Sequence, residues 1–174
     1  MSGIMRIRRT HGVLGGTLVA LLGIWGGLIP FVGPYFHYAY TPDKAWTYST
    51  GRLWLEILPG AAALLGGLLL IAARSRHVGL LGAFLGIVAG AWFVLGNVLA
   101  ALWTTAAPAG VPASTGTLAR AMEEVGFFVG LGLVLVLISA AVAGRITAVP
   151  RLAVAEVTTP VTTVPDTEET KVIG

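Results

Sequence analysis

Two pairs of oppositely charged residues repeat with helical spacing in this sequence. Arg52 and Glu56 are four residues apart, and so are Arg120 and Glu124, with Glu123 beside them. Residues four apart lie on one face of an α-helix, within reach of each other. A cluster of these side chains could bind a lipid head group, an ion or a partner protein. The alternative is that they are charges at helix starts, where acids favour the positive end of the helix dipole.

The remaining polar and aromatic candidates are isolated. Asn97 is an amide within a long apolar segment, which predicts an interhelical hydrogen bond, with substrate contact as the alternative. His37 could titrate or help hold a metal, but one histidine is not a metal site. Trp46 and Trp54 belong to an aromatic segment that could contribute to binding. Thr170 lies in a threonine-rich tail and suits phosphorylation, with an unmodified tail as the alternative.

The composition argues against most catalytic chemistry. The chain contains no cysteine, which excludes disulfides, cysteine metal sites and thiol catalysis. Its serine, histidine and aspartate residues do not gather in any catalytic spacing. We therefore predict no catalytic residue, no metal site and no cofactor.

The elements that position these residues are four long apolar blocks. Only 11% of the residues are charged and 56% are hydrophobic, too few charges for a water-soluble surface. A membrane-spanning helix needs roughly 20 residues, and the blocks cover about 12–33, 53–73, 78–103 and 118–143. The first is longer than the apolar part of a signal peptide and lacks a cleavage pattern. We predict an all-α polytopic membrane protein with four transmembrane helices in a compact bundle.

Basic residues predict the orientation, because short loops rich in lysine and arginine stay in the cytoplasm. They are more numerous on the side that holds both termini, so we expect a plasma-membrane protein with both ends cytoplasmic. The predicted parts are a basic N-terminus at 1–11, a transmembrane domain at 12–143 and a disordered cytoplasmic tail at 144–174. The basic residues on the cytoplasmic side are Arg6, Arg8, Arg9, Arg74, Arg76, Arg145 and Arg151, against Lys44, Arg52 and Arg120 outside.

Glycines and an internal similarity suggest how the helices pack. Many glycines in the blocks are spaced by four, as in Gly23 and Gly27, which lets helix backbones approach closely. The first block recurs in the third at a shift of 63 residues, and the second recurs in the fourth at a shift of 68. We hypothesise two repeated helical hairpins related by an axis along the membrane normal. The alternative is a shared bias toward glycine, leucine and alanine.

Two segments carry a family resemblance. Phe-Val-Gly-Pro-Tyr-Phe at 31–36 and Gly-Arg-Leu-Trp-Leu-Glu-Ile-Leu-Pro-Gly at 51–60 resemble uncharacterised four-helix integral membrane proteins of actinobacterial type. The resemblance covers about residues 10–143. It implies the four-helix fold and carries no activity with it.

These observations favour an integral membrane accessory or scaffold protein over an enzyme. It would act through helix packing and its aromatic outer face, with the lipid bilayer, other membrane proteins or further copies of itself as partners. The basic residues lie in small groups beside apolar blocks, so we expect no nucleic acid partner. One alternative is a small oligomeric transporter or channel, although such pathways are usually lined by polar groups. A second is a lipid-binding or lipid-modifying membrane protein.

Overall fold

The computed structural model describes residues 9–41, 44–100, 102 and 110–148, and these form helices joined by turns and two longer connections. Four helical segments are long and apolar enough to cross a membrane, which confirms the predicted all-α, four-helix fold. Their bounds are Gly12–Phe36, Thr50–Ala72, Arg76–Ala100 and Thr117–Thr147. The last extends beyond the predicted apolar block at its C-terminal end, because backbone hydrogen bonding continues the helix past the point where apolar residues stop.

Two of the four segments are interrupted by a short stretch of π-helix. A π turn bonds each carbonyl to the amide five residues on and often occurs at functional sites. The elements in chain order are α1 (Arg9–Val32), the 3-10 turn η1 (Gly33–Phe36), α2 (Thr50–Arg52), the π segment η2 (Leu53–Ile57), α3 (Leu58–Ala72), α4 (Arg76–Ala100), α5 (Thr117–Glu124), the π segment η3 (Val125–Val129) and α6 (Gly130–Thr147).

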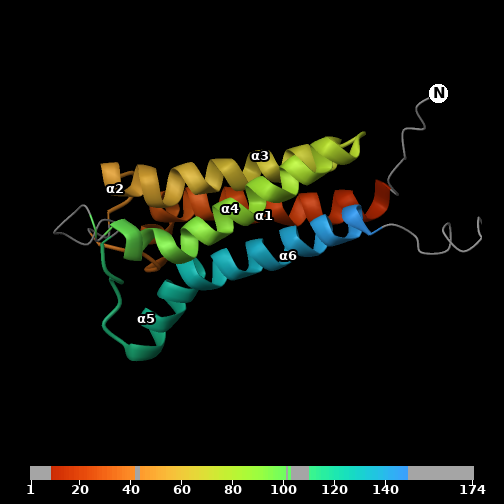
Figure 1. The fold of residues 1–174 in the computed structure, drawn as a ribbon. Helices are drawn as coiled ribbons and strands as arrows, with labels where there is room; N and C mark the ends of the chain where they lie inside the picture. Colours follow the sequence, from red (N-terminus) through yellow and green to blue (C-terminus); the bar gives the residue numbers. More distant parts are fainter. Residues whose placement is uncertain (1–8, 42–43, 101, 103–109, 149–174) are drawn as a thin grey trace, which may run out of the picture.

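The helices form an up-and-down bundle in chain order (Figure 1). Helix α1 packs against α3 and α6, and α4 packs against the same two helices. Arg76 at the start of α4 donates a hydrogen bond of 2.9 Å to the carbonyl of Thr147 at the end of α6. We call this end of the bundle the basic end. The opposite end, where the two longer connections lie, is called the loop end.

Glycine lets the helices of each hairpin approach at backbone distance. A Cβ atom added to Gly60 in α3 would lie 2.7 Å from the Gly27 amide nitrogen in α1. A Cβ atom added to Gly132 in α6 would lie 2.5 Å from the Gly90 carbonyl oxygen in α4. A side chain at either position would meet the backbone of the partner helix at less than 3 Å, so both hairpins depend on glycine where their helices touch.

The correspondence between the two hairpins stays a prediction at the level of register. Gly27 and Gly90 are 63 residues apart, the shift found in the sequence. Gly60 lies against the Gly23 carbonyl and the Gly27 amide, whereas Gly132 lies against the Gly90 carbonyl and the next turn, at Val94. The two glycine contacts therefore do not occupy equivalent positions. The first residues of η2 and η3 are 72 residues apart, compared with the shift of 68 found in the sequence.

Candidate functional site at the loop end

The two connections at the loop end bind each other through their backbones. The Thr41 amide donates to the Val111 carbonyl at 2.9 Å, and the Ala113 amide donates to the Ala39 carbonyl at 2.9 Å. These bonds flank an antiparallel bridge between Tyr40 and Pro112. The described parts of the two connections, which precede the second and fourth membrane segments, are therefore hydrogen-bonded to each other.

Arg52 holds the first connection in place from inside. Ser49 caps helix α2 by accepting a hydrogen bond of 3.2 Å from the Arg52 amide, which sets the start of the helix. The Arg52 side chain is only 2% exposed. Its guanidinium group donates to the carbonyls of Pro30 at 3.1 Å, Thr47 at 2.9 Å and Tyr40 at 3.2 Å. One buried cation thus joins the end of α1 to both halves of the connection.

Prolines explain why one of these carbonyls needs a side-chain donor. In an α-helix the Pro30 carbonyl would accept from the amide of residue 34, but that residue is Pro34 and has no N–H group. An unpaired buried carbonyl is costly, above all where no water can reach it. The Arg52 guanidinium supplies the missing donor.

Glu123 holds the second connection in a comparable way. Its side chain is 1% exposed. Its carboxylate accepts from the Ser114 hydroxyl at 2.6 Å, the Ser114 amide at 3.2 Å and the Ala39 amide at 3.4 Å. Three donors directed at one group suit a carboxylate, whose charge strengthens each bond. Glu123 therefore stabilises the contact between the two connections.

Glu56 is equally buried but has no such partners. It lies in the π segment η2 and is 1% exposed. Neither of its carboxyl oxygens has a hydrogen-bond partner. Arg52 is one turn away on the same segment, but its guanidinium group donates to backbone carbonyls instead. Glu56 is the only carboxyl group among the described residues that is buried in this unpaired state.

An aromatic cluster covers the second π segment. Tyr38 stacks on Phe127 at a centroid distance of 5.2 Å, and Tyr40 packs against Phe127 at 4.9 Å and Phe128 at 5.2 Å. The Tyr38 hydroxyl donates to the Met122 carbonyl at 2.7 Å. Burial raises the pKa of Tyr38, and the nearby Glu123 raises it further. Burial also raises the pKa of Tyr40, followed by the negative charges of Glu124 and Glu123.

Each π segment has a carbonyl that accepts a hydrogen bond from a tryptophan. The Trp92 indole in α4 donates to the Trp54 carbonyl in η2 at 2.8 Å. In the π pattern that carbonyl would accept from residue 59, which is Pro59 and has no N–H group. The Trp25 indole in α1 donates to the Gly126 carbonyl in η3 at 3.3 Å. Both bonds join one hairpin to the other.

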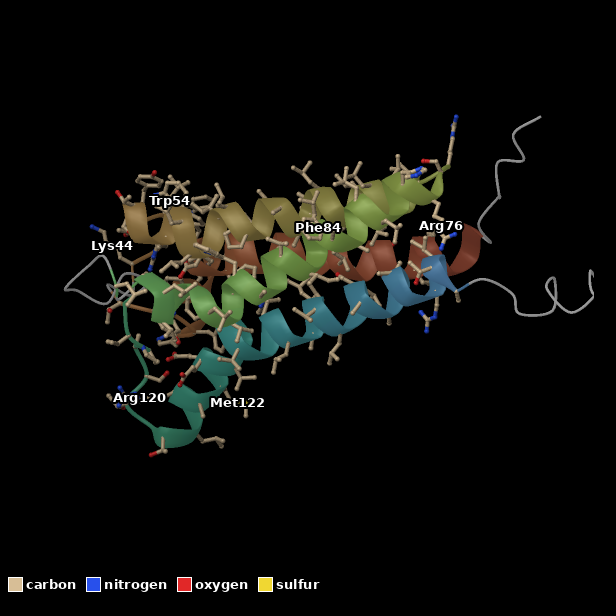
Figure 2. The ribbon with its side chains drawn as sticks, in the orientation of Figure 1. Lys44, Trp54, Arg76, Phe84, Arg120 and Met122 are labelled. Atoms are coloured by element: carbon tan, nitrogen blue, oxygen red, sulfur yellow. The ribbon has the colours of Figure 1, made fainter. Side chains whose placement is uncertain are left out.

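The structure separates the five charged residues of the predicted cluster into two sets. Arg52, Glu56 and Glu123 are buried, whereas Arg120 and Glu124 are exposed on α5. Figure 2 shows the Arg120 side chain extending away from the bundle at the loop end. The two Arg-Glu pairs share their spacing but not their surroundings, because α5 leans away from the other helices (Figure 1).

The other predicted site residues lie around this region without joining it. Asn97 is half-buried near the C-terminal end of α4. His37 is exposed and adopts a positive φ of 56° as the cap of η1. Trp46 is 67% exposed and packs on Phe31 at 5.8 Å, and Trp54 is 52% exposed. Thr170 lies outside the described residues.

Sequence reasoning missed several polar groups. Ser114 was overlooked because serine in a connection carries no distinctive signal. Ser139 in α6 is fully buried, its hydroxyl has no hydrogen-bond partner, and its Oγ atom lies against Gly86. The prolines at 34 and 59 were a usable signal, since each removes an amide that a helix carbonyl needs.

Within the described part of the chain, no group of three or more histidine, aspartate or glutamate residues could hold a metal ion. The arrangement is therefore a set of buried single charges and aromatic contacts. It can bind a proton or a hydrogen-bonding group, and it fixes the shape of the exposed loop surface. Comparison with known proteins adds no assignment, since no family model, curated protein or solved structure matches the chain.

Proposed function

We propose that this chain is a multi-pass plasma-membrane protein that serves as an accessory or scaffold subunit, with other membrane proteins bound at its loop end. The observation that carries the proposal is the hydrogen bonding that builds that end. Arg52 fixes the first connection to α1 and Glu123 joins the first connection to the second, through six hydrogen bonds in all. These two buried charged side chains therefore stabilise the shape of a surface and do not line a binding site.

The surface built in this way is rich in exposed aromatic side chains. Aromatic residues with one apolar face and one polar atom suit both the membrane interface and contacts with other proteins. Figure 2 shows Trp54 on the outside of the bundle at this end. The large aromatic residues exposed at the loop end are Tyr35, Phe36, Trp46, Tyr48 and Trp54.

The interior of the bundle supports a scaffold better than a lone pore. Glycines bring the helix backbones into direct contact along both hairpins. Ser139 is the one buried polar side chain near mid-depth among the described residues. Conduction pathways are usually lined by polar or charged groups, so transport by a single bundle is the less favoured function.

Photo-crosslinking tests the proposed docking surface. A photoreactive amino acid replaces Trp46 at the loop end or Phe84, which is 60% exposed on the side of α4, as a control. We expect a discrete protein adduct, identified by mass spectrometry, from position 46 and only lipid adducts from position 84. Lipid adducts alone at both positions in native membranes would contradict the proposal.

Labelling of single cysteines tests the proposed orientation. Because the chain contains no cysteine, one introduced thiol gives an unambiguous signal. Lys44 at the loop end and His77 near the basic end are both exposed. We expect a membrane-impermeant maleimide to label Lys44→Cys in intact cells and His77→Cys only after permeabilisation. The reverse pattern would place the termini outside.

A further inference from the structure

We propose that Glu56 is a proton-binding site within the membrane domain, a carboxyl group that holds one proton at neutral pH in the folded protein. The site is the π segment η2, which packs against α1 and α4 and in which the Glu56 side chain is buried. This inference concerns the bundle itself and does not depend on the accessory role proposed above.

The first argument is the absence of partners. Moving an ionised carboxylate from water into an apolar interior costs far more free energy than moving a neutral carboxylic acid. Buried charges are therefore paired or hydrogen-bonded in folded proteins. Glu56 is 1% exposed and neither oxygen accepts a hydrogen bond. Glu123 shows what the same fold provides for a buried carboxylate, namely three donors.

The second argument is the balance of buried charge. Among the described residues, the buried side chains that carry a charge in water at neutral pH are Arg52, Glu56 and Glu123. Arginine stays protonated in proteins, and the donors around Glu123 suit its ionised form. With both carboxyl groups ionised the buried set would carry one excess negative charge. A single proton on Glu56 makes the set neutral.

The neighbouring elements supply no other compensating charge. Arg52 on the same segment and Tyr40 on the first connection interact electrostatically with Glu56, and Glu123 and Glu124 on α5 are acidic. The helices that pack on η2 contribute none at this level, since residues 12–32 of α1 and 78–100 of α4 contain no ionisable side chain. A sodium ion would need several further oxygen ligands, and three nearby carbonyls already accept from Arg52.

Infrared spectroscopy of the full chain in lipid vesicles tests the proposal directly, because a protonated carboxyl group and a carboxylate have separate stretching bands. At neutral pH we expect a protonated-carboxyl band that shifts in heavy water and is lost in Glu56→Gln. The matched control is Glu124→Gln, which removes an exposed carboxyl group. It should lose carboxylate intensity and keep the protonated band.

Two results would overturn the proposal. If Glu56→Gln loses carboxylate intensity and the wild-type protein shows no protonated band, Glu56 is ionised. If sodium removes the protonated band at constant pH, while choline does not, the site binds a metal cation in place of the proton. Should Glu56→Gln fail to fold, Glu56→Asp keeps a carboxyl group, and its protonated band should move in frequency rather than disappear.

Discussion

The two helical hairpins share several structural features but differ in the hydrogen bonds that they provide to a buried glutamate. Each hairpin has a glycine contact between its helices and a π segment with a carbonyl that accepts from a tryptophan of the other hairpin. In the second hairpin Glu123 accepts three hydrogen bonds, whereas in the first Glu56 accepts none. The features that the hairpins share therefore stabilise the fold. The unpaired Glu56 carboxyl group is the feature that distinguishes the first hairpin, and it is the proposed proton-binding site.

Substituting the two glutamates should give the largest contrast. Glu123→Gln weakens hydrogen bonds to a charged acceptor, and we expect the free energy of unfolding to fall by about 2 kcal/mol. Glu56→Gln replaces a neutral group with a neutral group of similar shape, so we expect no measurable change. Denaturant unfolding in mixed micelles gives both values. Equal losses in the two variants would remove the distinction between the hairpins.

Alanine at the glycine contacts should destabilise both hairpins to a similar extent. A Cβ atom at Gly60 meets backbone atoms of α1, the nearest at 2.7 Å, and at Gly132 it meets the Gly90 carbonyl oxygen at 2.5 Å and the Phe93 Cβ atom at 3.1 Å. No side-chain rotation can move these atoms away, so we expect Gly60→Ala and Gly132→Ala each to cost about 3 kcal/mol, as for overpacked cores. Thermal unfolding in detergent measures both losses. Gly144→Ala is the control, since nothing lies within 4 Å of that position.

Removing the two tryptophan hydrogen bonds should show how much each bond stabilises its π segment. Trp92→Phe removes a bond of 2.8 Å to a carbonyl that Pro59 leaves without its usual donor, and we expect a loss of about 1 kcal/mol. Trp25→Phe removes a longer bond of 3.3 Å, and we expect a smaller loss. Hydrogen exchange of the amides in η2 and η3 reports each segment separately. A larger effect from Trp25→Phe would reverse this ranking.

Alkaline pH should weaken the second π segment slightly. Because burial raises the pKa of Tyr38, its neutral form stabilises the fold. That stability is fully present below the pKa of an unfolded tyrosine, about 10, and is lost as the pH rises through the higher pKa of the folded state. Thermal unfolding across this range should show the decrease, and Tyr38→Phe should reduce it. An unchanged slope in the variant would assign the decrease to another group.

The sequence predicts the architecture well and the local site only in part. Four apolar blocks suffice to predict four helices, because length and hydropathy decide which segments can span a bilayer. The spacing of Arg52 and Glu56 equals that of Arg120 and Glu124, so the pattern alone could not tell buried charges from exposed ones. That distinction depends on the tilt of α5 and on how the connections fold over the helices.

The sequence also did not predict the π segments. A π turn leaves no periodic pattern, since it adds a single residue to a helix. Only Pro59 points to one of them, through the amide it lacks. Glycine spacing predicted close helix contacts, but which glycines meet depends on how the helices pack, and spacing alone does not give that.

The bond between Arg52 and the Pro30 carbonyl couples two distant positions of the chain. Pro34 creates the need for a donor, and Arg52 meets it eighteen residues later. Replacing Pro34 with alanine supplies an amide four residues after Pro30, so loss of the Arg52 side chain should cost less in that background than in the wild-type chain. The effect of a substitution at one of these positions therefore depends on the residue at the other.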